Sequence, residues 1–563
     1  MLTKPAKRLL SSFIYRKRHL FSLAWLAGLL SGLATLLVPL SIGKYYSLIL
    51  HTNSARGKLF DALPFNVEQA ATFYIFFATI LVLHFVSGFF ARQLADLSAA
   101  LFAKELREHL FARHISRPLQ EQRQKPVGRS LLRYSGDMGP IKRLLSRGIV
   151  QALLDFQMIL LGVILLFMLN AVLASVILLL TLLFALVLLV INQYLLARVA
   201  EVRKIRSSNL AFVSSRLQAQ LTIQLMKREK KEWNKFARRS DKQFSRDKAL
   251  LFRENLQKAV VPGMMYALLL AVMISGQVLL QQPNAELDGS TLLVFIMFLI
   301  SIIPAFRRLM MVKRHWRDGG LSLGKIAADI DKNSLFCEGT EASELVDHEK
   351  ISLEVKAFTT RYEGREPLRF PAICLKKGES LCLRAPSGSG KTMLLEMIVG
   401  IREVPQGSIS INGTDISELP MQQVREMVAL HTPAAPLLGK TVSGVLGNPG
   451  KSGRKQALEL LRQLGFPLHK LPENLKLQIG EQGSSLSTGE KRILQLVRSL
   501  IQQRPIMLFD DPFTGLSAEA AQQLKYLLAE LGKERIVVLA ERGAEKNWPQ
   551  LKTYQREHVL AYA

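Results

Sequence analysis

Long uncharged apolar stretches dominate the first part of the chain. Five of them reach the length of about 20 residues that a bilayer crossing requires, and they are 21–43, 69–91, 156–197, 259–285 and 289–306. The third is long enough for two crossings joined by a short turn near Asn170. The pattern therefore predicts six membrane-spanning helices.

The texture changes after a polar stretch at 331–350, where short β-rich runs begin to alternate with helical patterns. Such alternation is typical of an α/β domain. We expect a transmembrane domain over 1–330, a linker over 331–350 and an α/β domain over 351–563, in which the Gly-rich SGSGKT at 387–392 indicates a P-loop nucleotide-binding domain. The predicted fold class is a membrane α-helical bundle, with six transmembrane helices and long cytoplasmic extensions, joined to that α/β domain.

Basic residues are concentrated in the membrane half. The net charge is +29, and the segments 92–147 and 198–258 hold twelve and seventeen Lys and Arg residues. The positive-inside rule places these segments, and with them both termini, in the cytoplasm. We expect an integral protein of a bacterial inner membrane, in contact with membrane lipid. Its basic segments are either solvated faces or surfaces attracted to anionic lipid headgroups. No nucleic acid is expected as a partner, because the charge lies where membrane topology already requires it.

Both basic segments keep a helical pattern. The sequences LFAKELREHLFARHI (101–115) and SSRLQAQLTIQLMKREKKEWNKF (214–236) space their apolar residues three and four positions apart. The membrane helices are therefore expected to continue into the cytoplasm. The first apolar run is too long for the core of a signal peptide and lacks a clear A-x-A site, so no cleavage is expected.

A few polar residues stand inside the apolar stretches. His84, Asn192 and Gln277 either hydrogen-bond between helices or mark a substrate path. A basic cluster follows the sixth predicted crossing and either lines a cavity for anionic cargo or anchors the helix at the interface; it contains Arg307, Arg308, Lys313, Arg314 and Arg317.

The stretch ESLCLRAPSGSGKTMLLEMIVG has the order strand, Gly-rich turn, helix. In that order, backbone N–H groups of the turn surround phosphates, Lys391 reaches the outer phosphates and Thr392 can ligate Mg²⁺. The residues expected to cradle the nucleotide are Ser387, Gly388, Ser389, Gly390, Lys391 and Thr392. Ala385 replaces the first glycine of this motif, and if the position needs a positive φ its methyl group costs about 1 kcal/mol.

Two further motifs, IGEQGSSLSTGEKRILQLVRSL and IMLFDDPFTGLS, follow in the order typical of one family. With them the chain resembles the ATP-binding-cassette (ABC) exporters in their half-transporter form, over nearly its whole length. Leu486–Glu490 matches the LSGGQ signature at three of five positions. The resemblance implies a dimer in which each of two ATP molecules lies between one phosphate loop and the partner's signature, here contributed by Ser487, Gly489 and Glu490.

Carried over to this sequence, the family's site is incomplete. Asp510 fits the carboxylate that organises Mg²⁺, and Tyr362 either stacks on adenine or belongs to the core. Asp511 stands at the catalytic glutamate's position and is shorter by one C–C bond, roughly 1.5 Å; misplacement by about 1 Å can slow a reaction about a hundredfold.

Two further family positions differ. The sequence has Thr432-Pro433 where a glutamine is expected, and Glu541 where a histidine is expected. A glutamate about 4 Å from the γ-phosphate would be repelled by roughly 4 kcal/mol per unit charge at an effective dielectric of about 20.

The sequence thus favours one subunit of an exporter that holds ATP and Mg²⁺ at a poorly hydrolytic site and pairs with a non-identical half-transporter. A slow homodimeric exporter or lipid flippase, and a nucleotide-gated channel or membrane regulator, are the alternatives. The substrate stays unknown. The cysteines Cys337, Cys374 and Cys382 follow no metal or disulfide spacing, so we expect buried reduced thiols.

Overall fold

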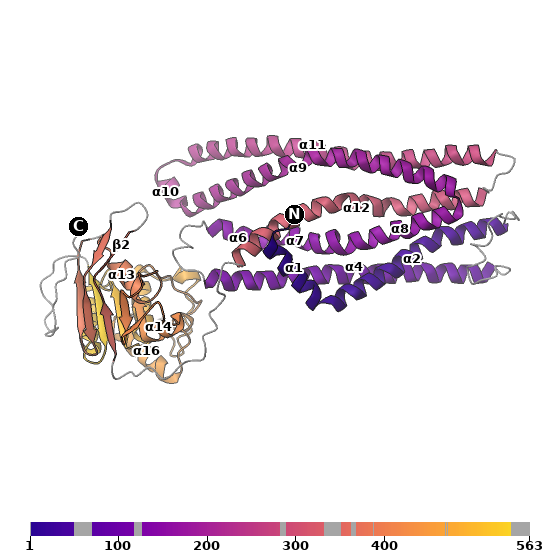
Figure 1. Cartoon of the computed structure of the whole chain (residues 1–563). Helices are drawn as coiled ribbons and strands as arrows, with labels where there is room; N and C mark the ends of the chain where they lie inside the picture. Colours follow the sequence, from indigo (N-terminus) through magenta and orange to yellow (C-terminus); the bar gives the residue numbers. More distant parts are fainter. Residues whose placement is uncertain are drawn as a thin grey trace. The chain divides into compact units, whose positions relative to one another are not determined.

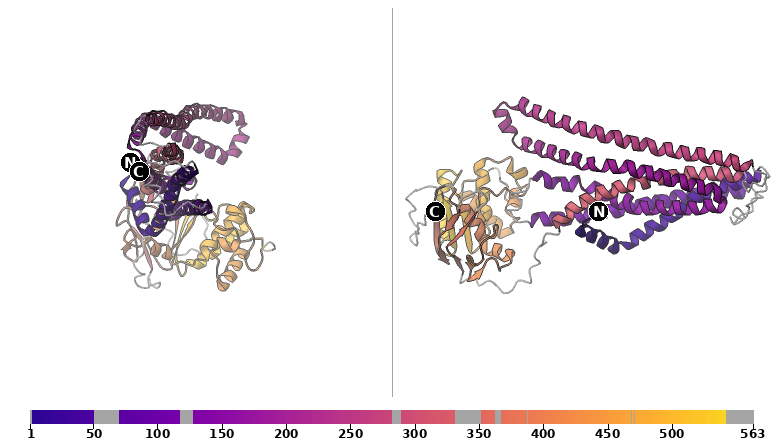
Figure 2. Two further views of the ribbon diagram at one scale, coloured as in Figure 1. Left: turned by 90° about the vertical axis from the view of Figure 1, so that its right-hand side faces the viewer. Right: turned by 45° about the horizontal axis from the view of Figure 1, so that its top comes forward.

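The computed structural model describes residues 2–49, 70–116, 127–281, 289–330, 351–361, 367–386, 388–467, 469 and 471–541. The chain divides into two compact units, one with the helices up to Ile330 and one with the sheets from Ile351 onward. Each unit is described by itself, and Figures 1 and 2 show the elements of both.

Long helices that lie alongside one another make up the first unit (Figure 1). They are α2 (Arg18–Ile49), α4 (Ala70–Ile115), α8 (Gln151–Leu169), α9 (Ala171–Gln218), α11 (Glu229–Leu280) and α12 (Gly289–Ile330). The shorter elements are α1 (Lys4–Arg16), α6 (Val127–Ser135), α7 (Met138–Arg143), the π-helix η1 (Leu144–Val150) and α10 (Gln220–Leu225). Figure 2 shows that α9 and α11 run side by side as a hairpin.

The predicted helical membrane bundle is confirmed. In the described part of the chain, five helices are long and apolar enough to cross a bilayer, within Arg18–Tyr46, Ala71–Ile115, Arg133–Leu169, Pro262–Leu280 and Thr291–Ile330. The remaining predicted crossing corresponds to a shorter apolar segment, Ala171–Phe184, at the start of α9. A sixth crossing on α9 therefore stays a prediction.

The turn within the third apolar stretch, between the third and fourth predicted crossings, lies at Asn170, as predicted. This residue is extended (φ −156°, ψ 115°), ends α8 and begins α9. Its side-chain Oδ1 accepts hydrogen bonds from the backbone N–H groups of Val172 at 3.0 Å and Leu173 at 3.1 Å. Because the first turn of a helix leaves such donors without intrahelical partners, Asn170 stabilises the start of α9.

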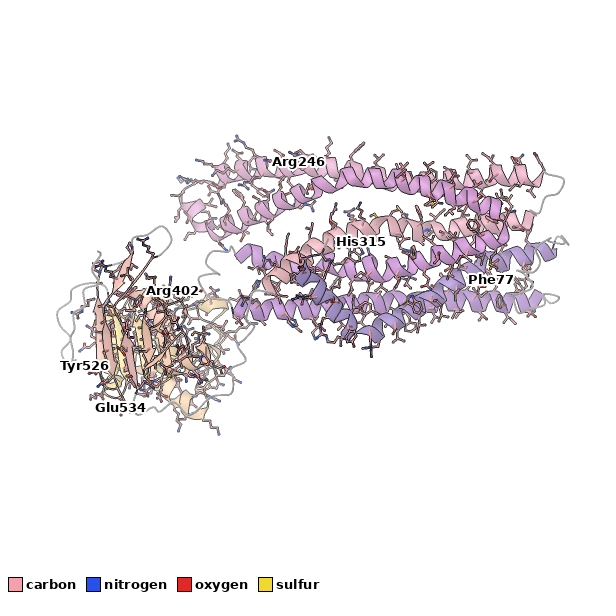
Figure 3. The ribbon with its side chains drawn as sticks, in the orientation of Figure 1. Phe77, Arg246, His315, Arg402, Tyr526 and Glu534 are labelled. Carbon is pink, nitrogen blue, oxygen red and sulfur yellow. The ribbon has the colours of Figure 1, made fainter. Side chains whose placement is uncertain are left out.

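The helices extend well beyond the length that a bilayer needs. α4, α9 and α11 contain 46, 48 and 52 residues, so the predicted continuation of the helices beyond the apolar stretches is confirmed. Their cytoplasmic location stays a prediction. The helical pattern over 214–236 is nevertheless interrupted twice, at Ala219 before α10 and at Lys227 after it. Lys227 has a φ of 50°, which a right-handed helix does not allow. Figure 3 labels Arg246 on α11 of this hairpin and Phe77 on α4.

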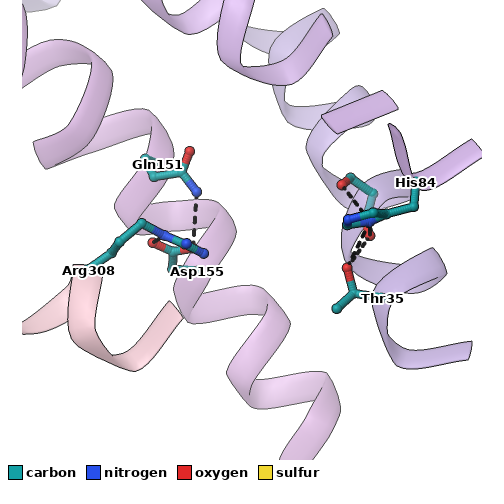
Figure 4. Close-up of polar contacts among 6 residues, drawn as sticks. Thr35, His84, Gln151, Asp155 and Arg308 are labelled. Atoms are coloured by element: carbon teal, nitrogen blue, oxygen red, sulfur yellow. Dashed lines mark hydrogen bonds and ion pairs between the residues drawn. The ribbon is translucent and has the colours of Figure 1, made fainter. Parts of the chain in front are cut away.

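Of the polar residues in the apolar stretches, His84 joins two helices (Figure 4). Its Nδ1 on α4 lies 3.1 Å from Thr35 Oγ1 and 3.4 Å from Ser31 Oγ on α2. This geometry supports the helix-to-helix interpretation. Gln277 is exposed on α11, and the side chain of Asn192 lies outside the described residues.

Three residues of the basic cluster on α12, Arg308, Arg314 and Arg317, pair with acidic residues. Arg308 donates to Asp155 of α8 through Nε at 2.9 Å and Nη2 at 2.7 Å, and Gln151 donates to the same carboxylate at 3.0 Å (Figure 4). Arg317 pairs with Asp318 at 3.1 Å. Arg308 is therefore occupied by a buried carboxylate of its own chain, which argues against its serving as a free contact for anionic cargo.

In its described residues, the second unit contains two four-stranded sheets and a two-stranded antiparallel pair, β2 (Phe358–Thr360) with β3 (Leu368–Phe370). The antiparallel sheet has the order β4-β1-β6-β7 and the parallel sheet the order β5-β10-β9-β8. Their strands are β1 (Ser352–Val355), β4 (Ile373–Lys376), β5 (Ser380–Arg384), β6 (Ile409–Ile411), β7 (Thr414–Asp415), β8 (Val428–His431), β9 (Ile506–Asp510) and β10 (Ile536–Glu541). The predicted α/β domain is confirmed.

Two hydrophobic cores cover the two faces of the parallel sheet. Leu508 and Val538 face one core, which also contains α13, and Phe509 and Leu539 face the other, which contains α17. This alternation follows from the opposite directions of successive side chains on a strand. The helices of this unit are α13 (Lys391–Ile398), α14 (Met421–Met427), α15 (Val442–Val445), α16 (Lys451–Gln463), the 3₁₀ helix η3 (Glu481–Gly483), α17 (Thr488–Leu500) and α18 (Ala518–Leu531).

The expectation of buried thiols is wrong for Cys374, which is exposed on β4. Residues of β4 alternate between buried and exposed, and Cys374 falls on the exposed side. Cys382 of β5 is half-buried, and Cys337 lies outside the described residues.

Candidate nucleotide-binding site

The predicted phosphate loop connects β5 to α13. Gly388 and Gly390 have φ values of 92° and 91°, and Gly390 is the residue from which α13 starts. A Cβ at Gly390 would lie 3.1 Å from Leu368 Cδ1 and 3.2 Å from Phe370 Cζ. Both the backbone conformation and this close approach therefore favour glycine at position 390. Ser387, another predicted residue of the loop, lies outside the described residues.

Ala385 does not carry the strain that the sequence left open. None of the described non-glycine residues with a positive φ is Ala385, and its side chain is buried in the core that contains α13. The conditional cost of about 1 kcal/mol for a left-handed alanine therefore does not arise at this position. The methyl group adds apolar contact instead.

Lys391 is held over the loop. Its ammonium group donates to the carbonyl oxygens of Ala385 and, at 3.0 Å, of Pro386, and it lies 3.5 Å from Ser389 Oγ. The side chain is buried, as is that of Ser389. A buried ammonium beside the first turn of α13, where backbone N–H groups lack intrahelical partners, provides positive charge and donors for an anionic group.

Asp510 gathers two hydroxyl groups at the carboxyl end of β9. Thr392 Oγ1 donates to its two carboxylate oxygens at 3.0 and 2.9 Å, and Thr432 Oγ1 lies 3.4 Å from Oδ2. Desolvation raises the pKa of Asp510, while the hydrogen bond from Thr392 opposes this shift. Carboxylate and hydroxyl oxygens are the hard ligands that Mg²⁺ prefers, so the residues present fit the predicted metal.

The contact of Thr432 was not anticipated from the sequence, where Thr432-Pro433 registered only as the loss of a glutamine. Gln495 and Arg498 of α17 hold the same loop by donating to the carbonyl oxygens of Ala435 at 2.7 Å and Pro436 at 3.1 Å. Thr432 directly follows β8, and β8 lies next to β9 in the parallel sheet. This position could have indicated the contact between Thr432 and Asp510.

Asp511 follows directly after β9 in a left-handed conformation, with φ 43°. Its backbone N–H donates to the carbonyl oxygen of Ala540 on β10 at 2.8 Å. The backbone of Asp511 is therefore anchored to β10. How far its carboxylate extends from the strand depends on the length of the side chain alone.

Glu541 ends β10, which lies between β5 and β9. Its Oε2 lies 3.9 Å from Cys382 Sγ on β5. The carboxylate therefore extends back over β5. At neutral pH a carboxylate only accepts hydrogen bonds, whereas a histidine can donate one to a phosphate.

The predicted signature residues lie at the start of α17. Ser487 caps this helix: its Oγ accepts from the Glu490 N–H at 3.2 Å, and the Glu490 carboxylate accepts from the Ser487 N–H at 2.7 Å. Ser487 is exposed, and a Cβ at Gly489 would have as its nearest neighbour the Gly515 carbonyl oxygen at 3.7 Å. A nucleotide contact of Glu490 stays a prediction, because its carboxylate already caps the helix.

The structure therefore unites Lys391, Thr392 and Asp510 with Asp511 and Glu541 at the carboxyl edge of the parallel sheet. Ligands bind at this edge in open α/β sheets. Tyr362, the predicted adenine-stacking residue, lies outside the described residues.

Comparison with known families agrees with both units. The ABC transporter transmembrane region matches residues 21–306, and the ABC transporter domain matches residues 370–514. A solved structure described as a bacterial Atm1-family ABC exporter with ATP bound has a TM-score of 0.78 at 18% identity, covering 93% of this chain and 91% of its own.

Curated relatives include several proteins named ATP-dependent lipid A-core flippase. The protein of Desulfotalea psychrophila is 23% identical over 485 residues, which cover 83% of each chain. That of Haemophilus influenzae is 26% identical over 284 residues, covering 49% of this chain and 47% of the relative. The chain thus matches about half the length of the latter, and the same holds for the Vibrio cholerae protein at 45%. With both of the family's domains matched in succession on one polypeptide, this chain belongs to the ABC transporters.

Proposed function

We propose that this chain is one half of an exporter that couples ATP binding and hydrolysis to the movement of a substrate across a membrane. We further propose that it is the degenerate subunit of a heterodimer, whose own site binds Mg-ATP and hydrolyses it slowly. One observation carries this proposal: Lys391 and the pair Thr392–Asp510 keep a binding arrangement, while Glu541 extends toward Cys382.

Binding of ATP is supported by charge and hydrogen bonding that the loop already organises. Lys391 provides one buried positive charge, and Asp510 with Thr392 provides oxygen ligands for Mg²⁺. Thr392 and Asp510 would hold Mg²⁺, and its charge would offset part of the negative charge of the phosphates. Lys391 acts through its charge, and the N–H groups of the loop are donors whose positions the backbone fixes. The substitutions at Asp511 and Glu541 therefore do not remove these binding groups.

Slow hydrolysis is supported by two of the three replaced positions, Asp511 and Glu541. The backbone of Asp511 is fixed by its N–H bond to Ala540, so its carboxylate ends roughly 1.5 Å short of a glutamate's reach. Glu541 adds a negative charge and offers no donor for a γ-phosphate. The change at Asp511 acts on the activation of water, and the change at Glu541 removes a donor to the γ-phosphate, while Lys391, Thr392 and Asp510 keep their hydrogen bonds.

The signature supports a role in a partner's site. The helix cap made by Ser487 and Glu490 presents the start of α17 in a defined conformation, and the side of Gly489 has space for a close approach. The Ser487 hydroxyl accepts one bond and keeps its proton for donation to a phosphate. A competent site could therefore form between this signature and the phosphate loop of a different half-transporter.

A second half-transporter is also supported by the exposed end of the α9–α11 hairpin. α10 has no buried residue in this chain, and Leu225 and Trp233 are 75% and 68% exposed. Apolar side chains this exposed, on a segment that carries many basic residues and is expected in the cytoplasm, favour a protein contact. We propose the partner half-transporter as the occupant of this surface.

A second candidate is a slow homodimeric exporter or lipid flippase, and the names of the relatives favour the flippase activity. The exposed apolar faces of α2, α4 and α8 fit contact with membrane lipid in either case. Location in a bacterial inner membrane with cytoplasmic termini is part of the proposal, based on the basic segments on α4, α9 and α11. A channel or regulator gated by nucleotide is the third possibility, and the substrate itself is not assigned.

The test compares binding with turnover in the purified full-length chain in lipid nanodiscs. We expect saturable Mg-ATP binding that Lys391→Ala weakens at least tenfold, together with very slow hydrolysis. Co-purification with a half-transporter that has an intact glutamate and histidine should restore turnover. Vigorous hydrolysis by the chain alone, lost in Lys391→Ala, would refute the degenerate-subunit proposal in favour of the homodimer.

A further inference from the structure

Two residues of opposite charge end neighbouring strands beside the phosphate loop. Arg384 is the last residue of β5 and Glu541 the last of β10, and the parallel register pairs them directly. Neighbouring strands lie about 4.8 Å apart, and paired residues of parallel strands point to the same face of the sheet. The side chains of Arg384 and Glu541 therefore start next to each other. Arg384 directly precedes Ala385, where the phosphate loop begins.

Cys382 indicates where both charged groups lie. It stands two residues before Arg384 on the same face of β5, and its Sγ is 3.9 Å from Glu541 Oε2. Its thiol pKa is raised to about 11, first by burial and then by the negative charge of Glu541, while Arg384 opposes the shift. Both charges are thus close enough to act on one sulfur atom. Glu541 leans back over β5, along the face that Arg384 shares.

A half-buried carboxylate at the edge of a nucleotide site has two unfavourable effects. It loses solvation, and it repels the phosphates that the loop is built to bind. An arginine stays charged at any physiological pH and can neutralise it through several donors. The position of Arg384, fixed by the strand register, allows this without any movement of the phosphate loop.

We propose that Arg384 is the counter-charge that holds Glu541 away from the nucleotide, and so permits this site to keep ATP although a carboxylate ends β10. This inference rests on the proposed function, in which the site binds ATP. Arg384 is thereby a positioning residue that acts through Glu541 and sets the preference between ATP and ADP. Without Arg384, the Glu541 carboxylate would repel ATP more than ADP, because ATP carries the additional terminal phosphate.

The experiment is a double-mutant cycle on nucleotide affinity. Equilibrium binding of Mg-ATP and Mg-ADP is measured on the full-length chain in nanodiscs for wild type, Arg384→Ala, Glu541→Gln and the double variant. We expect Arg384→Ala to weaken ATP binding about tenfold and ADP binding less than threefold. Glu541→Gln in the Arg384→Ala background should return ATP affinity to within about threefold of wild type.

Two controls separate this effect from misfolding. Arg384→Lys keeps the positive charge and should keep ATP affinity within about threefold of wild type. Arg462→Ala removes an arginine on α16, away from β5 and β10, and should leave the affinities for ATP and ADP unchanged. If Arg384→Ala does not fold, Glu541→Gln alone still tests the idea, since it should bind ATP at least as tightly as wild type.

Three results would overturn the inference. ATP binding that is equally weak in Arg384→Ala and in the double variant would mean that Arg384 contacts phosphate itself. Unchanged ATP binding in Arg384→Ala would mean that Glu541 needs no counter-charge. Wild-type chain that binds no ATP at all, with or without Lys391→Ala, would refute the proposed function as well, and this result is distinct from the other two.

Discussion

Removal of Arg308 should destabilise the membrane unit by leaving a buried carboxylate without its counter-charge. The side chain of Asp155 is only 3% exposed, and Arg308, which binds it through two nitrogen atoms, is 47% exposed. In Arg308→Ala, Gln151 would remain as a single neutral donor at 3.0 Å. The pair joins α8 to α12, so the loss would act on the contact between two membrane helices.

The magnitude follows from the burial of the two partners. Breaking a fully buried ion pair costs about 3–5 kcal/mol. Because Arg308 is half-exposed, water can partly replace it, and we expect about 2–3 kcal/mol. At about 2 °C per kcal/mol for a unit of this size, the apparent unfolding midpoint should fall by about 5 °C.

The assay is thermal unfolding of the full-length chain in nanodiscs, with Arg206→Ala as the matched control. Arg206 pairs with Asp247 at 3.0 Å, but its side chain is 60% exposed. Such exposed pairs contribute about 0–1 kcal/mol, so the control should shift by less than about 2 °C. Asp155→Asn combined with Arg308→Ala should recover most of the loss. Equal midpoints for Arg308→Ala and Arg206→Ala would refute the reasoning.

Three further predictions concern the nucleotide-binding unit. Ser487→Arg should stop ATPase activity and transport of the assembled complex, because a bulky cation would stand at the start of α17, whereas Asp511→Asn should change them little; equal damage by both would place the chemistry in this chain's own site. N-ethylmaleimide at pH 7.5 should modify exposed Cys374 much faster than Cys382, because the thiolate is the reactive form and burial raises the Cys382 pKa to about 11; peptide mass spectrometry measures both rates, and comparable rates would contradict the burial. Burial lowers the pKa of His431 from 6.5 to about 4, so the unfolded chain alone binds this proton below pH 6.5 and stability falls by roughly 3 kcal/mol as the pH drops from 6.5 toward 4; His431→Phe should flatten the pH dependence of the unfolding midpoint in that window, and an unchanged slope would show that other groups cause it.

Features that depend on residues close together in the sequence were predictable. The apolar stretches, the turn at Asn170 and the glycines of the phosphate loop each follow from a local rule about solvation, helix capping or backbone conformation. Asn170 is an example, since its side chain bonds to backbone groups only two and three residues away. Such interactions need no knowledge of the rest of the fold.

Features that depend on the register of distant segments were not predictable. Asp155 and Arg308 are 153 residues apart, and nothing in either local sequence indicates the other. The exposure of Cys374 depends on which face of β4 meets the core, and a shift of one residue would have buried it. The direction of Glu541 likewise depends on its pairing with β5, so the sequence showed the substitution but not where the carboxylate lies.

ATP binding and ATP hydrolysis tolerate substitution differently. This difference accounts for the positions at which the sequence differs from the motifs of the ABC exporters. Lys391 and the N–H groups at the start of α13 act on phosphates through charge and through donors that the backbone fixes, and Coulomb attraction falls off only slowly with distance. Activation of water requires a carboxylate placed to within about 1 Å, so we expect the change of one methylene group at Asp511 to impair it. Loss of hydrolysis would therefore leave ATP binding, and with it closure of a dimer around two nucleotides, unaffected. A chain that keeps its signature can then contribute to a partner's reaction while its own site serves mainly to hold the two halves together.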